Sequence, residues 1–142
     1  MSLSRNDSRV LAMVILYQVE LFNKRNISYE LGNLIVNNTN SIDDDISFVK
    51  ELVYGVIEHE SDIESLVNSY LKNWSLSRLG LTDGAILKIA VYELLYTDTP
   101  HKVCIDEAIE LAKCFSDEKV VGMINGVLDK IYHEKIDDND GE

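Results

Sequence analysis

The sequence has little proline, little cysteine and few positive charges. Its 142 residues include one proline, two cysteines and 13 lysines or arginines against 25 acidic residues. Cys104 and Cys114 stand ten residues apart in one predicted helix, which separates them by about 15 Å, too far for a disulfide. The sequence therefore excludes a disulfide scaffold, and we expect reduced thiols and a cytoplasmic protein.

The sequence also lacks a long apolar run. A membrane span needs about 20 apolar residues, but Gln18 and Glu20 interrupt the first apolar stretch, and Arg5 and Arg9 precede or enter it. We expect neither a signal peptide nor a membrane span.

Catalytic and metal-binding motifs are absent as well. The sequence contains no glycine-rich phosphate loop, metalloprotease motif or nucleophile elbow. His101 and Cys104 share a helix face, but a catalytic zinc needs three protein ligands. We expect no enzyme, no metal and no cofactor.

Negative charge is what the sequence has in excess. The net charge is -12, which argues against binding nucleic acid by bulk electrostatics and favours a basic partner. Residues 41–64 hold eight acidic residues against one lysine, and residues 133–142 hold five against one. The first 25 residues carry four basic and two acidic side chains, so the N-terminus is a basic end on an acidic molecule.

Apolar residues follow a helical period nearly throughout, and no segment alternates with period two. This predicts an all-α, single compact helical domain of about six or seven helices over residues 1–132, followed by an acidic, disordered tail over residues 133–142. Residues 46–74 keep the period as one long helix, and Ser116 is expected to cap the last helix.

Asn125-Gly126 is a hairpin-turn dipeptide in isolation, but the helical period continues across it. We therefore predict a helix there. Glycine costs roughly 1 kcal/mol relative to alanine inside a helix, so we expect the backbone of another helix to pass close to Gly126, and likewise to Gly55.

A set of ordered motifs covers nearly the whole chain. Near the C-terminus stand Tyr92-Glu93-Leu94, then Pro100, Lys102-Val103, Glu107-Ala108 and Glu110-Leu111-Ala112-Lys113, then Asn125-Gly126-Val127-Leu128-Asp129-Lys130. Upstream stand Leu16-Tyr17-Gln18 and Leu81-Thr82-Asp83. In residue type and interval this series closely resembles the NusB family.

The resemblance implies an all-helical transcription antitermination factor without catalysis. Proteins of this family pair with NusE, which is ribosomal protein S-ten, and the pair binds the boxA element of nascent RNA. The complex joins other Nus factors on RNA polymerase and promotes processive ribosomal RNA transcription. The resemblance leaves the oligomeric state open between a monomer and a homodimer.

Four residues are expected to contact RNA under this resemblance. Arg5 and Arg9 lie four apart on one helix face, which suits phosphate contacts, although an ordinary solvated first turn has the same pattern. Lys119 and Met123 lie where the family's RNA face continues. Related N-termini are richer in arginine, so we expect weak RNA binding by this chain alone.

Three residues are expected on the partner surface. Asp83 stands where the family commonly has an acidic residue facing NusE, and an acid favoured by the helix dipole explains it equally well. Tyr70 and Trp74 lie one turn apart as candidate anchors, although aromatic residues in an apolar stripe more often belong to the core.

Two other functions stay open. The chain also resembles the RNA-recognition modules fused to ribosomal RNA cytosine methyltransferases, of which it would be a detached example. Its acidity and its thinned arginine motif are equally consistent with a helical adaptor that binds only protein.

Overall fold

The computed structural model describes residues 3–73 and 75–137, and these residues form helices joined by short loops. The helices are α1 (Arg5–Lys24), α2 (Leu31–Thr39), α3 (Ser47–Glu58), α4 (Glu60–Tyr70), α5 (Leu81–Tyr96), α6 (His101–Phe115) and α7 (Glu118–Tyr132), with a 3-10 turn η1 (Leu76–Arg78) and a π-helical turn η2 (His133–Asp137). The all-α prediction of six or seven helices is confirmed. None of the described helices is long and apolar enough to cross a bilayer.

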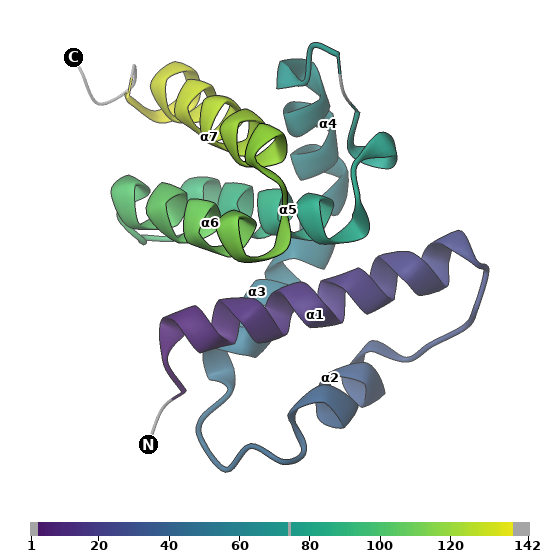
Figure 1. Cartoon of the computed structure of the whole chain (residues 1–142). Coiled ribbons are helices and arrows are strands. Elements are labelled where there is room, and N and C mark those ends of the chain that lie inside the picture. The colour runs from purple at the N-terminus through teal and green to yellow at the C-terminus, as the bar shows by residue number, and fades with distance from the viewer. Residues whose placement is uncertain (1–2, 74, 138–142) are drawn as a thin grey trace.

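Helix α5 lies at the centre of the fold. Every residue from Gly84 to Leu94 is buried, because α1, α3, α4, α6 and α7 all pack against it. Figure 1 shows α1, α2 and α3 on one side of the molecule and α4, α6 and α7 on the other. A helix that is apolar all round requires such enclosure, so α5 sets the positions of the helices that carry the candidate site.

The prediction of one long helix over residues 46–74 is wrong. Two helices occupy this segment, and His59 both ends α3 and begins α4. Helix α3 packs on α1 and α5, whereas α4 packs on α5 and α7. The apolar period persisted because both helices face the core, and no proline or glycine marks the break at His59.

The start of α7 and the tail also differ from expectation. Asp117 caps α7 by accepting the Val120 N–H at 2.9 Å, whereas Ser116 donates its hydroxyl to Asp83. The η2 turn places residues 133–137, the first half of the predicted tail, in a π-helical conformation. Residues 138–142 lie outside the described residues.

The helical prediction across Asn125-Gly126 is confirmed, since α7 runs through both residues. The reason offered for the two glycines, a closely passing helix backbone, is found at neither, because the nearest atoms at Gly55 belong to a side chain. At Gly55 the Tyr92 ring occupies the space that a side chain would need, whereas nothing lies within 4 Å of a Cβ built at Gly126. Gly126 leaves the surface of α7 open.

Candidate nucleic-acid interface

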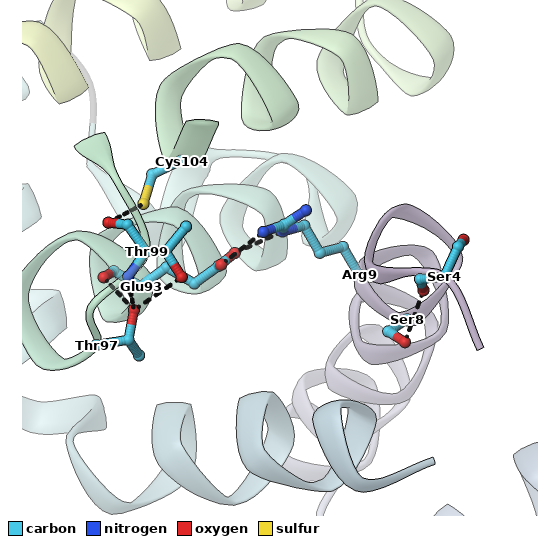
Figure 2. A network of polar contacts seen from close by, with 7 residues as sticks. All are labelled: Ser4, Ser8, Arg9, Glu93, Thr97, Thr99 and Cys104. Carbon is cyan, nitrogen blue, oxygen red and sulfur yellow. Dashed lines mark hydrogen bonds and ion pairs between the residues drawn. The ribbon is translucent and has the colours of Figure 1, made fainter. Parts of the chain in front are cut away.

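Helix α1 is joined to α5 by a buried ion pair between Arg9 and Glu93. The Arg9 Nε donates to Glu93 Oε2 at 2.7 Å and Nη2 donates to Oε1 at 2.8 Å, as Figure 2 shows. The two residues are 3% and 1% exposed. Burial opposes the charge of Arg9, yet the bonds to Glu93 keep its pKa above the ordinary value.

The expected solvated face shared by Arg5 and Arg9 is therefore corrected, while an RNA contact of Arg9 stays a prediction. Its guanidinium points into the helix packing and is neutralised by Glu93, so it does not share a solvated face with Arg5. Four-residue spacing places the two Cα atoms on one face of α1. The long Arg9 side chain follows the α5 surface inward instead, because α5 offers it a buried carboxylate.

The same network orders the loop between α5 and α6 (Figure 2). The Thr97 hydroxyl donates to the Glu93 carbonyl at 2.7 Å, and the Thr99 N–H donates to Thr97 Oγ1 at 3.2 Å. The Cys104 thiol donates to the Thr99 carbonyl at 3.6 Å. A chain of contacts thus links the start of α1 to the start of α6.

Arg5 is the exposed arginine of this region. Its guanidinium carbon lies 4.0 Å from the centroid of the Phe48 ring on α3, a distance at which a cation is attracted to the ring face. Ser4 caps the helix that carries Arg5 by accepting the Asp7 N–H at 3.0 Å. The charge of Arg5 is therefore held in place at the helix start.

A groove of about 600 Å³ lies beside Arg5 and is lined by residues of α1, α3, α6 and the α5–α6 loop. Its carboxylates belong to Glu51, Asp98 and Glu107. With Arg9 already neutralised by Glu93, Arg5 faces three acids. The groove alone is therefore poorly suited to phosphate.

Asp83 lies at the opposite end of α5. It accepts the Ser116 hydroxyl bond and is half-buried in the first turn of the helix. Ten helical residues separate Asp83 from Glu93, or about 15 Å. Lys119, which is exposed near the start of α7, belongs to the Asp83 end, so the four predicted RNA residues do not form one cluster.

Met123 of α7 and Tyr70, the last residue of α4, lie close together. Both line a hollow of about 240 Å³ between the end of α4 and α7, although one was predicted to contact RNA and the other the partner. The Tyr70 hydroxyl donates to Glu134 at 3.0 Å. The expected contact at Trp74 lies outside the described residues.

Sequence reasoning missed a second buried charge. Lys88 on α5 is 7% exposed, and its ammonium lies 2.9 Å from Glu64, 3.3 Å from Glu60 and 3.7 Å from Glu20. Burial lowers the pKa of Lys88, but the bond to Glu64 and the attraction of the other carboxylates raise it overall. These three glutamates are close enough to hold a metal ion, but the Lys88 ammonium lies among them.

One sequence signal pointed to both buried charges. Lys88 and Glu93 are the charged residues that interrupt the apolar run Ala85–Leu94. A charge inside an otherwise apolar helix must find a partner when the helix is buried. The signal does not say which distant residue that partner is.

Comparison with known proteins decides the family. The model of the NusB family matches residues 6–133. The chain belongs to the NusB family of transcription antitermination proteins. It is 43% identical over 91% of its length to transcription antitermination protein NusB of Staphylococcus haemolyticus, of which 99% is covered.

Solved structures agree with the family assignment. The chain resembles T. maritima NusB with a TM-score of 0.82 and 33% identity, covering 94% of each chain. It also resembles one chain of a solved structure of antitermination factors NusB and NusE in complex with dsRNA. The TM-score of this match is 0.78 and the sequence identity is 26%, over 91% of this chain and 96% of that chain. The NusB family is non-enzymatic, which agrees with the expectation from the missing catalytic motifs.

Proposed function

We propose that this protein binds boxA RNA together with NusE and so promotes processive transcription of ribosomal RNA. The observation that carries the proposal is the match, over nearly the full chain, to a chain of a solved complex of NusB, NusE and RNA. Nascent RNA is made in the bacterial cytoplasm, so we place the protein there. Other Nus factors and RNA polymerase then belong to the same assembly without direct contact being required.

The charge distribution supports a division of labour within such a complex. A chain of net charge -12 repels RNA unless a positive group is presented locally and a basic partner supplies the rest. Arg5 is such a group, held on Phe48 at the start of α1. Lys119 and Met123 on α7 remain proposed RNA contacts, and Asp83, Tyr70 and Trp74 remain proposed partner contacts.

The proposal is tested by measuring RNA binding with and without NusE. A boxA-containing RNA and a scrambled RNA of the same composition are titrated with this protein alone and with the preformed pair. We expect weak binding alone and a sequence-dependent gain with NusE that Arg5→Ala reduces. Equal affinity for both RNAs would reject the proposal, and a NusE complex that never binds RNA would favour a protein-binding adaptor.

A further inference from the structure

Three aromatic rings stack where the end of α5 meets the junction of α3 and α4. The His59 ring lies nearly parallel to that of Tyr96, with the centroids 3.8 Å apart and the planes 14° apart. The Tyr92 ring centroid lies 6.1 Å from that of His59 and 5.8 Å from that of Tyr96. Tyr92 is buried, with its ring against Gly55, whereas Tyr96 is 40% exposed. The stack therefore runs from the core to the surface.

The outer face of α3 adjoins this stack. Glu51, Tyr54 and Glu58 follow one another at steps of three and four, so they share one helix face. All three are exposed, Tyr54 to 47%. Burial raises the pKa of Tyr92, and the charges of the nearby Glu51 and Glu58 raise it further. We call the exposed residues Glu51, Tyr54, Glu58 and Tyr96 the α3–α5 surface.

The α3–α5 surface is negative. Neither Glu51 nor Glu58 forms an ion pair among residues 3–73 and 75–137. Glu51 also lines the groove beside Arg5, where Asp98 and Glu107 add two further carboxylates. The negative charge therefore continues from α3 to the α5–α6 loop and α6.

Two cations lie close to the α3–α5 surface without neutralising it. Lys50 lies near the start of α3, where its charge acts on Asp45. Arg5 is held on the ring of Phe48, with its guanidinium carbon 4.0 Å from the centroid. The carboxylates of the surface therefore stay available to a ligand.

The chemistry of the surface selects a cationic ligand. RNA is repelled by the carboxylates, and a second copy of this chain carries the same negative charge. The faces of exposed tyrosine rings attract cations. Arginine stacks on such a ring and can also bind a carboxylate through two parallel hydrogen bonds. Arginine is thus the side chain that suits both kinds of group on this surface.

We propose that the α3–α5 surface docks an arginine-rich segment of a protein partner other than NusE. Asp83, the proposed NusE contact, lies near the start of α5 and Tyr96 at its end, about 20 Å apart along the helix. Both partners can therefore be bound at the same time. The inference goes beyond the proposed function, because it adds a second protein partner on another side of the molecule.

The first test compares two double variants that remove the same negative charge. Glu51→Gln with Glu58→Gln alters the α3–α5 surface. Glu30→Gln with Glu118→Gln is the matched control, since Glu30 precedes α2 and Glu118 begins α7, and all four side chains are exposed. A synthetic peptide of alternating arginine and glycine is titrated calorimetrically into each full-length protein. The surface variant should bind about fivefold more weakly than the wild type, and the control should stay within about twofold.

The second test removes the exposed rings. Tyr54→Leu with Tyr96→Leu should weaken binding of the same peptide about tenfold, because two cation–aromatic contacts are lost. Tyr17→Leu with Tyr29→Leu is the control, since these tyrosines are 39% and 37% exposed and lie on α1 and before α2. Its affinity should stay within about twofold of the wild type. Equal thermal unfolding midpoints verify that the two variants fold.

Two further measurements use the wild-type protein. The arginine peptide should shift the NMR signals of the Tyr54, His59 and Tyr96 rings. A peptide with citrulline in place of arginine keeps the shape without the charge and should not bind. Saturating NusE should leave the affinity for the arginine peptide unchanged.

Three results would overturn the inference. Equal weakening in each surface variant and its control would show that the peptide responds only to net charge. Equal affinity for the citrulline peptide would show that no cation is recognised. Displacement of the arginine peptide by NusE would make the surface part of the NusE contact. None of these titrations contains RNA, so a protein that fails to bind boxA RNA would still test the inference in full.

Discussion

Arg9 of α1 and Glu93 of α5, 84 positions apart in the sequence, form a two-bond ion pair with donor–acceptor distances of 2.7 and 2.8 Å inside the helix packing. The pair holds the start of α1 against the end of α5, where the α5–α6 loop begins. Arg5, one turn earlier on α1, lies over the Phe48 ring. The first prediction concerns this pair.

Breaking the Arg9–Glu93 pair from one side should destabilise the protein strongly. Glu93→Leu or Arg9→Met leaves one buried charge without its partner, and each should lower the free energy of unfolding by about 3–5 kcal/mol. Replacing both, as Arg9→Met with Glu93→Leu, should cost far less because no buried charge remains. Urea unfolding of the wild type, the two single variants and the double variant measures the four free energies. If the loss in the double variant equals the sum of the two single losses, the ion pair does not stabilise the protein.

The same double variant tests whether Arg9 contacts RNA. If Arg9 only positions α1, the Arg9→Met and Glu93→Leu protein assembled with NusE should bind boxA-containing RNA within about twofold of the wild type. Arg5→Ala serves as the positive control and should weaken binding about tenfold. A loss as large as that of Arg5→Ala would restore Arg9 as a direct contact.

Phe48 should support RNA binding through its ring. A cation held on an aromatic face loses that attraction when the ring is removed, so Phe48→Leu should weaken RNA binding by the NusE pair roughly two- to fivefold. Phe48→Tyr keeps the ring and should bind as the wild type does. Fluorescence titration measures both, and equal affinity of the two variants would show that the ring contributes nothing.

Lys88 should be required to neutralise Glu20, Glu60 and Glu64. In Lys88→Met the three carboxylates repel one another, so the protein should unfold at a lower temperature than the wild type. Because their oxygens lie within 4.8 Å of one another, added calcium should raise the unfolding temperature of the variant by several degrees and leave the wild type nearly unchanged. An equal calcium response in both proteins would refute this role of Lys88.

Alanine should have opposite effects at two helical glycines. At Gly55 a methyl group meets the Tyr92 ring, and Gly55→Ala should cost about 1–3 kcal/mol through overpacking. At Gly126 the space is open, and Gly126→Ala should stabilise the protein by up to about 1 kcal/mol because alanine favours the helix. Chemical denaturation measures both changes, and a loss of stability at Gly126 would contradict the open surface.

The two cysteines should react differently with thiol reagents. Burial, and then the negative charge of Glu93, raise the pKa of Cys104 from 9.0 to about 12, whereas Cys114 is exposed. At pH 8 Ellman's reagent should titrate one thiol in the folded protein and two after denaturation, with Cys114→Ser abolishing the reaction of the folded state. Rapid modification of two thiols in the folded protein would be inconsistent with this burial.

The raised pKa of Cys104 also predicts a dependence of stability on pH. Above about pH 9 the unfolded chain releases the Cys104 proton while the folded protein retains it. The stability that Cys104 contributes is therefore complete below pH 9 and is lost progressively toward pH 12. Cys104→Ala should flatten this alkaline decline in urea unfolding midpoints, and an unchanged decline would assign it to other groups.

Local sequence patterns predicted the structure correctly where it depends on residues that are close together in the sequence. The helical period predicted α7 through Asn125-Gly126, since one face of that helix is continuously apolar. The same period concealed the break at His59, because two successive helices can each turn their apolar face to one core. The break depends on what α3 and α4 pack against, and those partners lie far away in the sequence.

The candidate site shows the same limit. Spacing placed Arg5 and Arg9 on one helix face, but the direction of a long side chain depends on the groups around it. Glu93 draws Arg9 inward and Phe48 lies beneath Arg5. Likewise, His59 and Tyr96 are distant in the sequence, and their rings stack only because α3 and α5 pack together.

The sequence by itself determined the helical class, the excess of negative charge, the absence of catalytic motifs and the family, because composition, period and motif order are properties of the chain. Tertiary structure alone decided which charges are neutralised and which are presented. Which charges are neutralised depends on contacts between residues up to 84 positions apart in the sequence. A buried charge is stable only when an opposite charge is near it, and no local pattern shows which residue provides that charge.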